Sequence, residues 1–315
     1  VDSVTAELNQ RNLTVHLIIH PVIASKRSAA GKLTAVAKAD DTLDTVAESI
    51  MHLQITEQTD AGMLKELAKS LTKVLGDVRA AVEDWRPMRV RIADVIAELD
   101  STLQTASVPK DEIEESAAFL RWLDDNNFTF LGYRDYACKG STKKQTLSIV
   151  PRSGLGLLRD NKVTVIEGIS DGAVLPPDLA AFMKHSALVL INKANQRSTI
   201  HRGVHLDTVM VKKFDTRGNT VGQRLFVGLF TSTVYTQQVQ AIPVIRRKVR
   251  KVVDESGFSP NGHDGKALTH ILETLPRDEL FQINAAELRD MATGILHLQE
   301  RQKVAMFIRR DPFGR

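Results

Sequence analysis

The amino-acid sequence predicts an α+β chain with a small two-layer domain, a larger antiparallel-sheet domain and a helical connector. Three observations lead to this order. Helical and strand-like patterns alternate over the first hundred residues. Short β-rich runs separated by turn residues follow in the middle of the chain. From Gln237 to about Gln299, apolar residues recur at helical spacing instead.

The composition is that of an ordinary globular protein. The 315 residues suffice for two or three domains, and the net charge of +4 comes from 42 basic and 38 acidic residues. This mixed charge does not favour a nucleic-acid partner. No apolar run reaches the roughly 18–20 residues of a membrane span, and no signal peptide is visible. With Cys138 as the single cysteine, we expect a cytoplasmic protein without a membrane partner.

The first domain is predicted from alternating helix and strand signals. A helix around Val4 and Leu8 ends near Arg11–Asn12, and a second helix is capped by Thr59–Asp60 and stopped by Gly76. The other predicted elements are a strand over Leu13–Val22, a mobile loop over Ala24–Thr45, a strand over Ser49–Glu57, a strand or helix over Val78–Trp85, and a helix over Val90–Leu99 that Pro87 opens.

In order, these elements are α-β-β-α-β followed by a helix. A strand in front of them would complete the β-α-β-β-α-β ferredoxin-like unit. That unit is the skeleton of ACT domains, which sense small molecules. Any other small two-layer α+β domain would give the same pattern, so the spacing alone leaves both interpretations open.

The middle of the chain predicts an antiparallel sheet with a few helices, as in sensor domains of the PAS or GAF type. A helix over Glu112–Asn126 leads in, a second is capped near Pro176–Asp178, and Thr216–Asn219 predicts a hairpin turn. The predicted strands are Phe128–Tyr133, Thr146–Val150, Val163–Ile166, Ala187–Lys193, Thr208–Phe214 and Gln223–Tyr235.

Candidate chemical motifs are few. Gly154 and Gly156 form a Gly-x-Gly pair, but a dinucleotide loop needs a third glycine and a strand-to-helix crossover, so a turn is favoured. His201 and His205, followed by Asp207, could share a strand face, but a metal needs further converging ligands, so ordinary polar positions are favoured. Cys138 has no histidine near it in sequence to activate a thiolate.

A basic cluster runs from Arg246 to Lys251. At helical spacing Val244, Ile245, Val249, Val252 and Val253 form an apolar stripe, with the cations expected to point outward. A solvated or subunit-facing helix is favoured over nucleic-acid binding, since no aromatic residues accompany the cluster. The sequence therefore predicts no catalytic, cofactor-binding or metal-binding residue in this chain.

Many separate runs, spread over the whole chain, carry a family resemblance. They are Val1–Asn9, Val15–Pro21, Arg79–Trp85, Phe119–Leu123, Phe128–Arg134, Gly154–Asp160, Lys193–Arg202, Phe230–Ser232, His263–Leu268, Leu275–Gln282 and Arg309–Arg315. In this order they resemble the N-terminal region of the very large bacterial NAD-specific glutamate dehydrogenases.

The resemblance implies a function that composition and spacing do not. The parent enzyme would oxidatively deaminate L-glutamate to 2-oxoglutarate and ammonia with NAD, and this chain would be its inactive regulatory and assembly segment of ACT and PAS-like modules. The family's catalytic lysine and aspartate and its Rossmann glycines belong to a later domain, so none is carried over. An amino-acid effector and a homo-oligomer are expected. The alternative is a free-standing ligand-sensing or protein-interaction module.

The resemblance also sets the expected domain boundaries. A strand precedes Val1 in the family, so the ACT-like sheet here would lack its first strand, and Val78–Trp85 would be its fourth. Val304–Ile308 would open a further domain. The expected parts are a truncated ACT-like domain (1–86), a helix and linker (87–111), a PAS-like domain (112–235), a helical connector (236–300) and the start of a second ACT-like domain (301–315).

Overall fold

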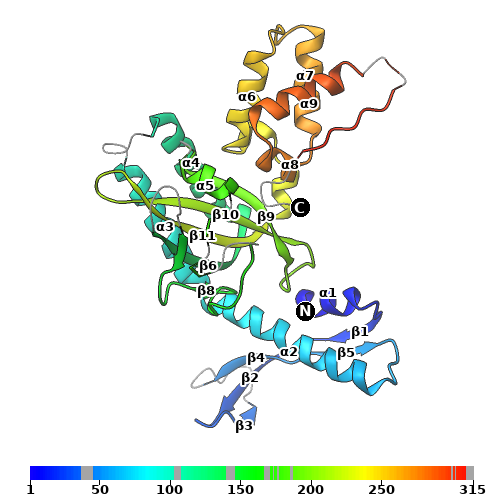
Figure 1. Cartoon of the computed structure of the whole chain (residues 1–315). Helices are drawn as coiled ribbons and strands as arrows, with labels where there is room; N and C mark the ends of the chain where they lie inside the picture. The colour runs from blue at the N-terminus through cyan, green and yellow to red at the C-terminus, as the bar shows by residue number, and fades with distance from the viewer. Residues whose placement is uncertain are drawn as a thin grey trace. The chain divides into compact units, whose positions relative to one another are not determined.

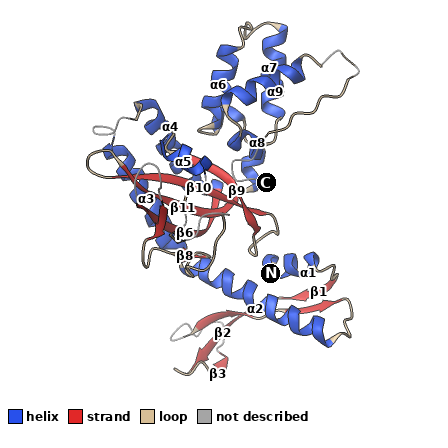
Figure 2. Cartoon of the chain, in the orientation of Figure 1, coloured by secondary structure: helices blue, strands red, loops and turns tan. Residues whose placement is uncertain are grey.

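The computed structural model describes residues 1–36, 45–102, 108–139, 146–166, 171–172, 174–175, 177–184, 187–298, 301 and 303–309 (Figure 1). Within these residues helices and strands are mixed, and every strand pair is antiparallel (Figure 2). The α+β class predicted from the sequence is confirmed.

The chain forms two compact units. The first contains Val1–Arg79 and the loop Ser198–Val204, and the second contains Ala80–Arg197 and His205–Arg315. The boundary between them falls inside helix α2 (Ala61–Glu83). Each unit is described by itself below.

The first unit has two layers. Helix α1 (Asp2–Gln10) and α2 contribute Val4, Leu8 and Leu67 to a small core, which packs on strands β1 (Val15–Ile19) and β5 (His52–Ile55). As predicted, α1 ends at a left-handed asparagine, Asn12, with φ of +59°. Two helices on an antiparallel strand pair are consistent with the ACT-like expectation.

The segment between β1 and β5 corrects two predictions. The loop expected over Ala24–Thr45 contains strand structure, and the single strand expected over Ser49–Glu57 is broken at Ile50–Met51. A separate three-stranded sheet, ordered β3-β2-β4, arises from β2 (Val22–Arg27), β3 (Leu33–Val36) and β4 (Val46–Ser49). Residues 37–44 of the expected loop lie outside the described residues. Because β2 ends in the polar run Ser25–Arg27 and small, polar residues follow it, the stretch had the composition of a loop.

Helix α2 corrects two further predictions. Asp60 caps it as expected, accepting from the Met63 N–H at 2.7 Å. It does not stop at Gly76, and the fourth strand expected over Val78–Trp85 is helical as far as Glu83. Val74 and Ala81, seven residues apart, are both buried, so the apolar stripe continues through the glycine at helical period.

The second unit begins with two helices that lead into a sheet. Helix α3 (Trp85–Thr102) holds Pro87 in its first turn, as predicted, and α4 (Lys110–Trp122) ends in a wide turn at Leu123–Asn127. The sheet strands are β6 (Phe128–Lys139), β7 (Thr146–Ile149), β8 (Leu155–Gly156), β9 (Val189–Arg197), β10 (His205–Phe214) and β11 (Thr220–Phe230).

The strands are ordered β7-β6-β11-β10-β9, with β8 on β6. The hairpin turn predicted at Thr216–Asn219 joins β10 to β11, and Gly218 takes φ of +80° there. The helix predicted near residues 176–178 is α5 (Pro177–Lys184).

Two strand predictions in this unit were wrong. Val163–Ile166 is irregular: the Val163 carbonyl accepts from the Arg134 side chain at 2.9 Å, and one backbone bond, from the Asn195 N–H to the Val165 carbonyl at 3.3 Å, links the segment to β9. The strand expected over Gln223–Tyr235 ends at Phe230, and Ser232–Tyr235 is a 3₁₀ turn.

The segment after the sheet is helical, as predicted. Its elements are the 3₁₀ turn Val239–Ala241, α6 (Ile245–Glu255), α7 (His263–Thr274), α8 (Arg277–Gln282) and α9 (Ala285–Leu296). Residues 303–309 have no regular secondary structure, so the short run Val304–Ile308 is not a strand in this structure. Across the described residues, no helix combines the length and apolar character that a membrane span requires.

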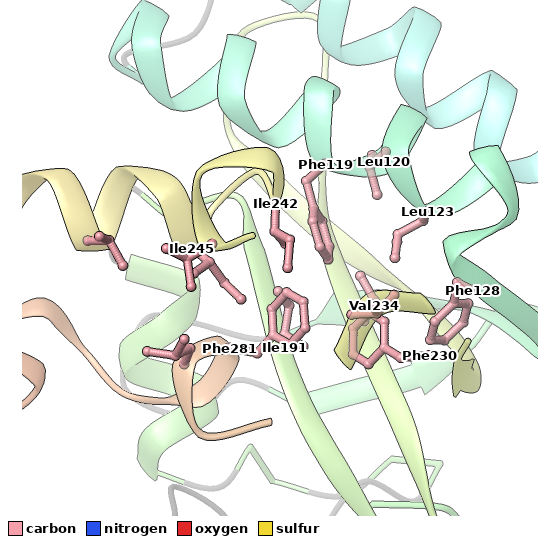
Figure 3. Close-up of a cluster of buried hydrophobic side chains, with 14 of the residues drawn as sticks. Phe119, Leu120, Leu123, Phe128, Ile191, Phe230, Val234, Ile242, Ile245 and Phe281 are labelled. Carbon is pink, nitrogen blue, oxygen red and sulfur yellow. The ribbon is translucent and has the colours of Figure 1, made fainter. Parts of the chain in front are cut away.

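One apolar core joins the sheet to these helices (Figure 3). The Phe230 and Phe281 rings stack with centroids 4.4 Å apart, and Phe281 also lies 6.0 Å from the Phe119 ring. Ile242 and Ile245 complete the contact from the start of α6. Because β11, α8, α4 and α6 all contribute, the helical segment is packed on the sheet domain and is not a separate appendage.

Candidate functional site

A pocket of about 370 Å³ opens in the second unit where α4, β9, α6 and the α8–α9 connection meet. We call it the junction pocket. Its volume is within the range of small-molecule sites. The apolar part of its wall is Val189, Leu190, Ile191, Val244, Phe281 and Ile283. The polar part includes Glu112, Glu115, Arg247, Lys248, Lys251 and Asn284.

Both carboxylates of the junction pocket form ion pairs with arginines of α6. Glu115 accepts from Arg246 at 2.7 and 2.9 Å and from the Val244 N–H at 2.8 Å. Burial would raise the pKa of Glu115, but these donors outweigh it and lower the pKa. Glu112 pairs with Arg247 at 2.6 Å. Neither carboxylate is therefore left to attract a cationic ligand.

Lys248 is a half-buried cation of the pocket. Its Nζ donates to the backbone carbonyls of Leu280 at 3.0 Å and Phe281 at 2.7 Å. Burial lowers its pKa to about 7; nearby Arg309 lowers it further, and Glu279 acts in the opposite direction. No carboxylate in the described part of the chain forms a salt bridge with Lys248. Two carbonyl dipoles hold the amine in place, and Glu279 acts on it without forming a salt bridge.

Val244, at the start of α6, has an unusual backbone. Its φ of +69° and ψ of −48° lie in the rare γ-turn region, which is strained for a β-branched residue. The hydrogen bond from its N–H to Glu115 fixes this conformation. Such strain persists only where the surrounding structure enforces it, and it concentrates at functional sites.

A partly buried ion-pair network links the sheet to α8. Lys193 of β9 contacts Asp207 of β10 at 2.6 Å and Asp278 of α8 at 3.1 Å. Burial disfavours the charged amine, but the two carboxylates outweigh it and raise the pKa of Lys193. Breaking such a network leaves an uncompensated buried charge, so it holds α8 in register with the sheet.

The glycine pair Gly154 and Gly156 is a structural turn. At Gly156 φ is +57°, and a Cβ atom would lie 2.2 Å from the Leu131 carbonyl oxygen. Its N–H donates to Asp84 at 2.6 Å, and the Arg159 guanidinium donates two hydrogen bonds to the same carboxylate at 2.6 and 2.9 Å. The Gly156 N–H is bonded to Asp84 and is not available to a phosphate, which supports a structural turn over a dinucleotide-binding loop.

Neither the histidines nor the cysteine form a reactive cluster. His201 lies in the first unit, while His205 and Asp207 lie in the second, and the His205 ring is within 2.9 Å of the Ala194 carbonyl. Over the described ranges no three His, Cys, Asp or Glu residues are placed to hold a metal. Burial raises the pKa of the Cys138 thiol, the opposite of what a nucleophile needs.

The basic cluster Arg246–Lys251 points outward only in part: Arg247, Arg250 and Lys251 are exposed, as expected, while Arg246 and Lys248 are half-buried. Arg246 and Arg247 pair with Glu115 and Glu112 of α4, and Lys248 donates to α8 carbonyls. The sequence carried a signal for this that was missed. Ile245, Lys248, Val249 and Val252 follow helical spacing i, i+3, i+4, i+7, so Lys248 belongs to the apolar stripe.

A second, larger hollow lies in the first unit, against α1 and the loop His201–Gly203. It is wide open to solvent, and the Gln10 side chain reaches the position where a Cβ of Gly203 would stand. Its charged side chains are Asp2 and Arg202. The junction pocket, more enclosed and with a half-buried cation, is the better candidate site.

Two family models match parts of the chain. The model described as "Glutamate dehydrogenase, ACT1 domain" matches residues 1–71, and "Glutamate dehydrogenase, helical motif 1" matches residues 242–301. The whole chain also aligns with the NAD-specific glutamate dehydrogenases of Halomonas elongata, at 38% identity, and Pseudomonas aeruginosa, at 37%. The chain matches the N-terminal region of the large NAD-specific glutamate dehydrogenases.

The match to these glutamate dehydrogenases confirms the family resemblance. It extends to the NAD-specific glutamate dehydrogenase of Mycobacterium tuberculosis, which is 28% identical over 99% of this chain. The chain spans only about a fifth of each relative, 19%, 19% and 18% of their lengths. The junction pocket is formed largely where the helical motif meets the sheet domain.

Proposed function

We propose that this chain is the non-catalytic N-terminal part of an NAD-dependent glutamate dehydrogenase, with a regulatory and assembly role. One observation carries the proposal. Relatives named as NAD-specific glutamate dehydrogenases align with all of this chain at 37–38% identity, yet the chain covers only 19% of their lengths. The parent reaction would convert L-glutamate, NAD and water into 2-oxoglutarate, ammonia and NADH.

The motifs of the chain agree with a catalytic centre elsewhere in the parent protein. Gly154–Gly156, its one candidate dinucleotide motif, is a turn bound to Asp84. The NAD site and the groups that transfer the hydride would accordingly belong to other parts of the parent polypeptide.

The domain types support a sensing role. The first 71 residues match an ACT1 domain. The sheet of the second unit, leaving aside the short β8, orders its strands second, first, fifth, fourth and third along the chain, with α5 between the second and third. That order supports a PAS-like domain. Both domain types respond to small molecules in many proteins, so effector-dependent control of the parent enzyme, as a homo-oligomer, is the role we infer.

The test compares the purified 315-residue chain with the full polypeptide encoded by the same reading frame. We expect no glutamate-dependent NAD reduction by the 315-residue chain at 340 nm, and clear turnover by the full polypeptide. Turnover by the 315-residue chain would contradict the proposal. A reading frame without a Rossmann-type domain would contradict it as well, and would favour a free-standing sensor or interaction module.

A further inference from the structure

We propose that the junction pocket binds a small organic carboxylate with an apolar body. The assignment rests on the lining of the pocket, not on the enzyme function proposed above. It concerns a site distinct from the ACT-type domain of the first unit, since every lining residue belongs to the second unit.

The charged side chains of the pocket lining favour an anionic ligand. The two acidic side chains of the lining, Glu112 and Glu115, are paired with Arg247 and Arg246. Within the described residues, the hydrogen bonds of the Lys248 amine go to two backbone carbonyls, and neither goes to a carboxylate. Lys251 has Glu255 at 3.7 Å, a solvent-exposed pair of little energetic weight. The lining therefore keeps positive charge on Lys251 and, three residues before it on α6, an amine of Lys248 whose charged form an anion beside it would favour.

The walls select an apolar body and exclude a bare inorganic ion. Val189, Ile191, Val244 and Ile283 line the pocket, and its volume of about 370 Å³ exceeds that of a single phosphate. A carboxylate at the lysines would leave the rest of such a ligand against these aliphatic side chains. Removing apolar surface from water then adds roughly 25 cal/mol for each Å² buried.

Hydrogen bonds between α4 and α6 hold one wall of the pocket in place. Glu115 holds the strained Val244 backbone and Arg246 at once, so one carboxylate of α4 fixes the start of α6. Walls from α4 and β9 face walls from α6 and the start of α9. A ligand in this position would bind the sheet domain and the helical motif together, and would stabilise their contact.

Isothermal titration of the 315-residue chain with hexanoate, hexanamide and inorganic phosphate tests the proposal. Hexanoate and hexanamide share one apolar body and differ in charge, while phosphate has charge without the body. We expect hexanoate to bind at least about tenfold more tightly than either of the others, a difference of about 1.4 kcal/mol. Equal binding of hexanamide, or stronger binding of phosphate, would overturn the proposal, as would no binding of any of the three.

Variants locate the site. Lys251→Gln lies on the exposed side of α6 and should fold normally, yet weaken hexanoate binding at least about fivefold. Lys266→Gln, at an exposed position of α7, removes one lysine outside the pocket and should leave binding unchanged. Lys248→Met should abolish binding, and circular dichroism checks its fold. If Lys251→Gln binds hexanoate like the wild type while Lys266→Gln weakens it, the ligand sits elsewhere and the assignment fails.

Discussion

Lys248 occupies the middle of an apolar helix stripe, between Ile245 and Val249. An amine in that position is not tolerated in its charged form without partners. Two α8 carbonyls supply hydrogen bonds that a neutral amine can also make, and the pKa is lowered to about 7 by burial. The residue therefore changes charge near neutrality, mainly because of burial; Arg309 lowers its pKa further and Glu279 raises it.

This gives a stability prediction at the residue scale. The folded pKa of Lys248 lies below the roughly 10.4 of an unfolded lysine, so between about pH 7 and 10 only the unfolded chain binds this proton. The free energy of unfolding should then rise with pH, by at most about 1.4 kcal/mol per unit from this group. Urea unfolding from pH 6.5 to 9.5 should show that slope, and Lys248→Met should reduce it.

Lys266→Met, at an exposed position of α7, is the matched control and should retain the wild-type slope. If Lys248→Met kept the slope unchanged, Lys248 would titrate alike in both states, and its burial would have no electrostatic consequence.

At the scale of elements, glycines show how context decides what a residue does. Gly76 lies inside α2, and no atom stands within 4 Å of the place where a Cβ would be, so it costs helix propensity and serves no contact. Gly156, in contrast, has no room for a side chain: its φ is left-handed, and a carbonyl oxygen lies 2.2 Å from where a Cβ would stand. The same residue type is replaceable in one element and required in the other.

Two substitutions test this contrast. Gly76→Ala should raise the free energy of unfolding by about 0.5–1 kcal/mol, because alanine loses less backbone entropy in a helix. Gly156→Ala should lower it by at least about 2 kcal/mol, because the backbone must move away from Leu131. Both are measured by urea denaturation. Equal effects of the two changes, or a destabilising Gly76→Ala, would contradict the assignment of α2 as one continuous helix.

At the scale of the whole molecule, the two compact units differ in how much core they hold. The first unit has a small buried cluster of Val4, Leu8, Leu13 and Leu67. The second has an aromatic and aliphatic core that runs through the sheet into α6–α9. Local opening costs least where few apolar side chains are buried.

Hydrogen exchange followed by mass spectrometry should show this difference. Amides of β2, β3 and β4, whose side chains are mostly exposed, should exchange at least about a hundredfold faster than those of β10 and β11. The β10–β11 hairpin, buried on both faces, serves as the internal reference. Uniform protection across the two groups of strands would show that the first unit is stabilised by more than its own core.

Local pattern alone determined the class of the chain and most of its elements. The caps at Asp60 and Asn12, the turn at Thr216–Asn219 and the helices after Gln237 depend on neighbours in sequence, so periodicity and turn chemistry predict them. Local sequence pattern predicts the wrong element where contacts with residues distant in sequence determine the backbone. Val163–Ile166 has the composition of a strand, but its Val163 carbonyl accepts from the distant Arg134 side chain and only its Val165 carbonyl bonds to β9.

Only the tertiary structure decided the candidate site. The junction pocket draws on residues from Glu112 to Ala285, which no sequence window brings together. Whether a lysine of α6 is a solvated charge or a half-buried amine depends on where the α8 carbonyls lie. Burial and hydrogen bonding across distant elements set its protonation, because both act through space and not along the chain.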